Sequence, residues 1–164
     1  MKVTFVYPGI AMIGFNSLGG NCHDTVSVNL GMGYISSYLK KNSNHTADLI
    51  DLRDLKGWNH FESELQEKCP DIVGIYCNTV NYSSSLKSAE IAKRQGRTVV
   101  MGGPHATLDP HSLIDTSFVD CVIVGEGEKS FLDVVNHIEA GEALESVIQG
   151  EKIDNLDDIP FPDR

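Results

Sequence analysis

The chain has 164 residues, of which 41% are hydrophobic and 22% charged, a size and composition that suit one globular domain with a substantial core. Its net charge of −10 disfavours a nucleic-acid partner, because binding to phosphates needs a basic face. No apolar run approaches the roughly 20 residues that span a bilayer, and the start MKVTFVYPGIAMIGF lacks the layout of a signal peptide. We therefore expect a cytoplasmic protein with no membrane partner, whose four cysteines, all far apart in the sequence, are free thiols.

Short apolar runs alternate with longer amphipathic runs along the chain. In order, the pattern predicts a strand at 2–7, a glycine-rich loop at 8–24, a helix at 25–41, a strand at 45–52, a helix at 60–69, a strand at 71–77, a helix at 81–96, a strand at 97–102, a short helix at 110–117, a strand at 119–125 and a helix at 126–141. Residues 142–164 show no strong period, and the stretch 139–164 carries eight acidic residues against Lys152 and Arg164. We expect a domain over 1–141, followed by a solvated acidic linker over 142–164.

The repeated alternation of strand and helix predicts a parallel sheet covered on both faces. Right-handed crossovers leave few arrangements. We favour an α/β fold with a flavodoxin-like (Rossmann-type), doubly wound, five-stranded parallel sheet of order 2-1-3-4-5. Ligands bind such sheets beyond the carboxyl ends of the strands, so the loops at that edge are the candidate site.

Three of these loops supply the candidate binding residues: Asn78, Thr79, Val80 and Asn81 after the third strand; Gly102, Gly103, Pro104, His105 and Ala106 after the fourth; Gly125, Glu126 and Gly127 after the fifth. The glycine pair either leaves room for a ligand against the backbone or only turns the chain. The acids of GEGE either stabilise a helix start or accept hydrogen bonds from ligand hydroxyl or amide groups. They disfavour a phosphate cradle, because like charges repel.

The two histidines of MGGPHATLDPHS, His105 and His111, raise the question of a metal site. A catalytic zinc or iron site needs three or more ligands, so we expect no metal ligand here. His105 is a candidate ligand contact, and His111 is expected in the first turn of a helix. The sequence has no GxSxG, no P-loop and no GxGxxG after a strand, so we expect no catalysis by this chain alone.

The stretch VVMGGPHATLDPHSLIDTSFVDCVIVGEGEKSF, together with LGMGYISSYLKK and LIDL earlier in the chain, resembles the N-terminal cobalamin-binding domain of cobalamin-dependent radical S-adenosylmethionine enzymes. The resemblance implies a corrinoid across the carboxyl edge of the sheet, with its nucleotide tail lined by the three loops. It implies the loop 8–24 against the corrin, and a parent enzyme of the methyltransferase type.

The ending LDDIPFPDR resembles the linker that leads into the radical enzyme barrel of that family. The barrel's CxxxCxxC motif for a [4Fe–4S] cluster is absent from this sequence. We therefore expect a piece of a longer protein, whose own radical S-adenosylmethionine domain is the partner and holds the cluster and S-adenosylmethionine.

The DxHxxG motif, whose histidine ligates cobalt in other cobalamin domains, is also absent. We expect no protein histidine on the cobalt and disfavour His23 in that role. The alternative is a flavodoxin-like domain that binds another ligand or a partner protein. A signalling module of the response-regulator type is disfavoured, because the first and third strands end in Tyr7-Pro8 and Cys77-Asn78 rather than in acids.

Overall fold

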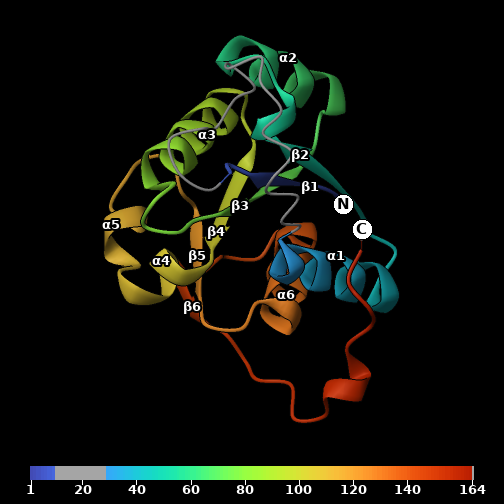
Figure 1. Ribbon diagram of the computed structural model, residues 1–164. Helices are drawn as coiled ribbons and strands as arrows, with labels where there is room; N and C mark the ends of the chain where they lie inside the picture. The colour runs from blue at the N-terminus through green and yellow to red at the C-terminus, as the bar shows by residue number, and fades with distance from the viewer. Residues whose placement is uncertain (10–28, 164) are drawn as a thin grey trace.

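A six-stranded parallel sheet forms the centre of the computed structural model, which describes residues 1–9 and 29–163 (Figure 1). The strands are β1 (Lys2–Tyr7), β2 (Thr46–Asp51), β3 (Ile72–Tyr76), β4 (Thr98–Gly102), β5 (Cys121–Val124) and β6 (Val147–Gln149). Their order is β2-β1-β3-β4-β5-β6, and every pairing is parallel. Val and Ile make the inner strands β3, β4 and β5 apolar on both sides, as a sheet buried on both faces requires, whereas the edge strand β2 carries Asp48 and Asp51.

Helices cover both faces of this sheet. They are α1 (Leu30–Asn42), α2 (Trp58–Lys68), α3 (Tyr82–Arg94), α4 (Pro104–Leu108), α5 (His111–Ile114) and α6 (Glu128–Ala140), with short 3-10 helices η2 (Leu52–Asp54) and η3 (Leu156–Asp158). Because strand side chains alternate between faces, Phe5 packs with α1 and α6, while Val6 packs with α2 and α3. The core is therefore two apolar layers, one on each side of the sheet.

The predicted order 2-1-3-4-5 is confirmed, but the sheet has a sixth strand that the sequence interpretation missed. β6 pairs with β5 and lies within the stretch expected to be a solvated linker. Backbone bonds at both its ends fix it, from Val122 N to Ser146 O at 2.8 Å and from Gly150 N to Val124 O at 2.7 Å. β6 has only three residues and lies among acidic residues. Its pairing with β5 stabilises it, and its own sequence carries no hydrophobic pattern that predicts a strand.

Two helices of the structure also differ from the prediction. Pro104 begins the helix α4, where the sequence predicted a loop, as proline favours the first position of a helix. The helix expected at 110–117 is the single turn α5.

α1 begins at Leu30 and is capped by Asn29, whose Oδ1 accepts a hydrogen bond from Met32 N at 3.0 Å. The predicted helical residues 25–28, and residues 10–24 of the predicted loop, lie outside the described residues.

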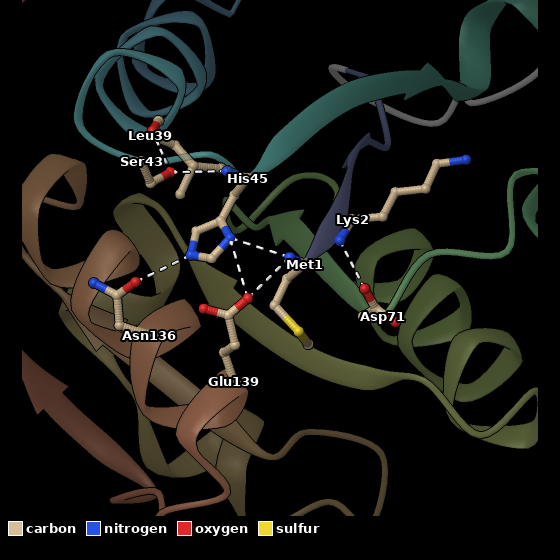
Figure 2. Close-up of polar contacts among 8 residues, drawn as sticks. All are labelled: Met1, Lys2, Leu39, Ser43, His45, Asp71, Asn136 and Glu139. Atoms are coloured by element: carbon tan, nitrogen blue, oxygen red, sulfur yellow. Dashed lines mark hydrogen bonds and ion pairs between the residues drawn. The ribbon is translucent and has the colours of Figure 1, made fainter.

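A polar cluster closes the edge of the sheet where β1 and β2 begin (Figure 2). His45 is only 7% exposed, so its ring nitrogens need partners inside the protein. The Met1 ammonium donates to His45 Nδ1 at 3.1 Å, and His45 Nε2 donates to Asn136 Oδ1 at 3.0 Å. Glu139 Oε1 lies 3.4 Å from the Met1 nitrogen. This cluster at the amino edge of the sheet, the edge where the strands begin, thus links β1 and β2 to α6.

The terminal segment, defined here as residues 150–163, returns from β6 to the outside of α1 (Figure 1). Asp163 N donates to Gly33 O at 3.1 Å. The Asp163 carboxylate accepts from Ser36 Oγ at 2.5 Å and from Lys40 Nζ at 2.6 Å. A side chain at Gly33 would collide with Asp163 O, 2.8 Å away, so this glycine allows the close approach. No helix in the described part of the chain is long and apolar enough to cross a membrane.

Candidate ligand cavity at the carboxyl edge of the sheet

A cavity of about 650 Å³ lies at the carboxyl edge of the sheet. It is bounded by α1, by α6 and by the loops that follow β4 and β5. Its lining includes Phe5, Gly74, Val100 and Ile123 of the sheet, Met32 and Ile35 of α1, and Phe131 of α6. Among the described residues that line it, the charged ones are Glu126 and Glu128, with no Lys, Arg or His. The described lining therefore suits a bulky, largely apolar ligand and offers no cation to a phosphate.

The two glycines at the end of β4 differ in what surrounds them. Gly103 has φ +112°, and a Cβ there would lie 2.6 Å from the carbonyl oxygen of Cys77. Gly103 is therefore required by the fold. A Cβ on Gly102 would lie 3.8 Å from Ile123 O and meet nothing closer, so this residue leaves open space beside the cavity. The turn interpretation therefore applies to Gly103, and room for a ligand at Gly102 stays a prediction.

The short helix α4 presents two different faces. Pro104, Thr107 and Leu108 line the cavity, at the spacing of one helical face. Ala106 is fully buried in the other core layer. Of the GGPHA stretch, Gly102, Gly103 and Pro104 line the cavity, while His105 and Ala106 do not.

His105 joins α4 to its neighbours instead. Its Nδ1 lies 3.3 Å from Thr79 Oγ1 and its Nε2 lies 3.0 Å from Ser112 Oγ. Its ring centroid is 4.7 Å from that of Tyr82. These contacts occupy both ring nitrogens, so the imidazole holds the loop after β3 against α4 and α5.

The predicted residues after β3 lie outside the cavity lining. Asn81 is 2% exposed, and its side chain accepts from Asn78 N and donates to Gly9 O, both at 2.8 Å. Asn78 Oδ1 in turn accepts from Asn81 N at 2.8 Å. Thr79 and Val80 are exposed at the surface. The amide pair therefore closes this loop and fastens it to the end of β1.

The GEGE loop lines the cavity with Gly125, Glu126 and Gly127. Gly125 has φ +88°, which glycine adopts without strain. A Cβ on Gly127 would lie 2.8 Å from Cδ1 of Ile35 on α1. The backbone of Gly150 packs directly on that of Glu126, so a side chain at Gly150 would clash. The loop is thus fixed between α1 and the terminal segment.

Sequence reasoning missed several lining residues. Gly74 lies in the middle of β3, under the Phe5 ring, whose Cδ1 would lie 2.8 Å from a Cβ there. A glycine inside a strand signals such close packing and could have been singled out. Thr107 belongs to the GGPHAT motif. Met32 and Ile35 carry no signal beyond the apolar face of their helix.

The described thiols and histidines form no metal site. Cys77 and Cys121 are buried, as expected. Burial raises the pKa of the Cys77 thiol to about 11, against a smaller lowering by a hydrogen bond with Ser85. Burial, with Asp120 and Glu145 nearby, raises the pKa of Cys121 to about 12. His111 is exposed in the first turn of α5, as predicted. Within the described ranges no group of three or more His, Cys, Asp or Glu residues could hold a metal ion.

Comparisons with known proteins agree with this geometry. The family model described as "B12 binding domain" matches residues 16–135. An uncharacterized methyltransferase of Pyrococcus horikoshii is 30% identical over 151 residues, covering 81% of this chain and 32% of the relative. The anaerobic magnesium-protoporphyrin IX monomethyl ester cyclase of Rubrivivax gelatinosus is 27% identical over 153 residues, covering 88% of this chain and 26% of the relative. The chain thus spans about a quarter to a third of the length of these relatives.

A solved structure with the same fold is the cobalamin-dependent S-adenosylmethionine radical enzyme OxsB, with aqua-cobalamin and S-adenosylmethionine bound. It superposes with a TM-score of 0.76 at 18% identity over 98% of this chain and 24% of that one. The radical S-adenosylmethionine methyltransferase TsrM of Kitasatospora setae gives 0.65 at 15% identity, over 86% of this chain and 26% of its own. At such identities these structures show a shared fold. With the family model matching most of its length, the chain belongs to the B12-binding domain family.

Proposed function

We propose that this chain is the cobalamin-binding module of a radical S-adenosylmethionine enzyme of the methyltransferase type. The observation that carries the proposal is the apolar cavity of about 650 Å³ at the carboxyl edge, with Gly102 and the GEGE loop on its wall. Relatives described as methyltransferases and as cobalamin-dependent radical enzymes support it. In this proposal the domain spans residues 1–141, and 142–164 lead toward a radical S-adenosylmethionine domain, with β6 adding to the sheet on the way.

The residues present fit such a cofactor. Gly102 leaves room for a ligand against the backbone, and Phe5, Val100 and Ile123 offer an apolar surface. Glu126 and Glu128 can accept hydrogen bonds from amide groups, of which a corrinoid has many. We extend the proposal to the other candidates: Asn78, Thr79, Val80, Asn81, His105 and Ala106 would hold the loops in place around it.

When bound, cobalamin supplies a cobalt centre that carries a methyl group. The chain's own residues bind and orient it. No histidine lines the cavity among the described residues, and both nitrogens of His105 already have partners. These contacts fit a cobalt without a protein histidine. We propose that the [4Fe–4S] cluster and S-adenosylmethionine are held by the radical S-adenosylmethionine domain. The buried thiols fit a reducing cytoplasm.

Titration with hydroxocobalamin tests the proposal. We expect the visible spectrum of the corrin to shift on addition of the protein, and the thermal midpoint of unfolding to rise with ligand concentration. The bound spectrum should lack the features of a histidine-ligated cobalt. A parallel titration with flavin mononucleotide serves as the control for a flavodoxin-like ligand. An unchanged corrin spectrum and midpoint, or a response to the flavin instead, would contradict the proposal.

A further inference from the structure

One hydroxyl joins the two glycine loops of the cavity. Thr107 Oγ1 accepts a hydrogen bond from Gly125 N at 3.0 Å and donates one to Gly103 O at 3.2 Å. Thr107 lies on the cavity face of α4, beside Pro104 and Leu108. The hydroxyl therefore bridges the loop after β4 and the loop after β5 at the place where both line the cavity.

The sheet joins these two loops to different neighbours: β4 pairs with β3 up to Gly102, and β5 pairs with β6 up to Val124. The ladder between β4 and β5 pairs only Val100 with Cys121 and Met101 with Val122 among the described residues. Beyond that ladder the chain continues through Gly103 and Gly125, both at positive φ. Cys77 packs against the loop after β4, and Ile35 and Gly150 pack against the loop after β5. Each loop is therefore held by a different part of the fold, and Thr107 links the two directly.

We propose that Thr107 is a positioning residue, whose hydroxyl sets the separation of the two loops and so preforms the cavity for its ligand. This inference rests on the proposed function. A ligand that must first bring the two loops to the right separation binds more weakly, because only the fraction of molecules in the competent arrangement can bind it. The bond from Gly125 N is exposed to solvent, so water replaces it when the hydroxyl is lost, and the fold persists.

Variants at this position separate the hydroxyl from the shape of the side chain. Thr107→Val keeps the shape and removes the hydroxyl. Thr107→Ala also removes the hydroxyl, and alanine has a high helix propensity, so α4 is kept. Thr107→Ser keeps the hydroxyl. We expect the hydroxyl-free variants to raise the Kd for hydroxocobalamin about five- to tenfold, the size of one lost hydrogen bond. Thr107→Ser should stay within about twofold of the wild type. Thermal midpoints confirm that each variant is folded.

Hydrogen exchange in the ligand-free protein distinguishes positioning from a direct ligand contact. We expect the Gly125 amide to exchange faster in Thr107→Val and Thr107→Ala, and at the wild-type rate in Thr107→Ser. Unchanged Gly125 exchange in the hydroxyl-free variants would overturn the positioning role, as would equal Kd values for Thr107→Val and wild type. Failure of the wild-type protein to bind hydroxocobalamin would overturn the proposed function, and with it this inference.

Discussion

Gly102 and Gly103 are neighbours in sequence, yet only one of them is required by the backbone. Gly103 turns the chain at φ +112° and lies against Cys77, where no side chain fits. Gly102 has an ordinary φ and faces open space beside the cavity. The same residue type is therefore required by the backbone at one position and leaves open space beside the cavity at the other.

Replacing each glycine by alanine tests this difference. We expect Gly103→Ala to lower the free energy of unfolding by about 1–3 kcal/mol, because it adds strain and a clash. Gly102→Ala should leave that free energy nearly unchanged and weaken hydroxocobalamin binding about tenfold, because its methyl group enters ligand space. Denaturant unfolding and a spectral titration measure the two effects. Unaltered affinity in Gly102→Ala would contradict the assignment.

The three described cysteines should differ sharply in reactivity. Cys69 is exposed, whereas burial keeps the pKa of Cys77 at about 11 and that of Cys121 at about 12. The thiolate is the reactive form, so both buried thiols are protonated and inert at pH 8. With Cys22 replaced by serine, we expect one fast-reacting thiol in the folded protein and three in denaturant. Loss of the fast phase in Cys69→Ser is the control, and rapid labelling of Cys77 would contradict the prediction.

At the scale of elements, the sequence predicts best where a long pattern decides the structure. The apolar runs at 2–7, 71–77 and 97–102 each became a strand, because a buried parallel strand needs no information beyond its own apolarity. β6 and α4 were missed because they are short and depend on neighbours: β6 on its ladder with β5, and α4 on the packing of Ala106.

The sequence likewise predicted one part of the candidate site and misplaced another. The glycines at the ends of β4 and β5 indicated the place of the cavity correctly, because glycine is used both where the backbone packs closely, as at Gly103 and Gly127, and where space is left open, as at Gly102. The polar run after β3 was expected at the ligand as well, but Asn78 and Asn81 bond to each other, and Thr79 lies beside His105. Such pairings depend on which way each side chain turns, and spacing along the sequence does not determine that.

The Asp163 carboxylate is one of the contacts that hold the terminal segment, beside those of Gly150, Glu151 and Asp158. Burial raises the pKa of Asp163, but the hydrogen bonds from Lys40 and Ser36 and the charge of Lys40 lower it more, so the net pKa lies below its ordinary value. A carboxyl whose pKa falls on folding stabilises the folded form above its unfolded pKa. That contribution disappears as the pH falls through the lowered value. Attachment of the segment to α1 should therefore weaken in acid.

Asp163→Asn tests this contact. Because Asp163 is 40% exposed, we expect a loss well below 1 kcal/mol in global stability but faster exchange of the Asp163 amide, which donates to Gly33. The variant should also lose the acid dependence of that exchange. Asp158→Asn is the matched control, since Asp158 contacts Lys41 through its backbone carbonyl. Equal exchange in Asp163→Asn and wild type would show that the carboxylate does not hold the segment.

At the scale of the whole molecule, the two edges of the sheet have different roles. The carboxyl edge holds the cavity, and the amino edge is closed by the cluster around His45 (Figure 2). α6 runs between them: Glu128, in its first turn, lines the cavity, and Asn136 and Glu139 contact the cluster. Stability and ligand binding should therefore be separable by mutation.

A substitution at His45 tests this separation. We expect His45→Ala to lower the free energy of unfolding by about 2–4 kcal/mol, because it leaves a cavity and removes the partners of Met1 and Asn136. Below its unfolding transition the variant should bind hydroxocobalamin with unchanged Kd, because the edge that it disturbs contributes nothing to the cavity lining. Combined with Gly102→Ala, the two effects should add, as they do for distant sites. A changed Kd in the folded His45→Ala protein, or strong non-additivity in the double variant, would instead mean that α6 couples the two edges.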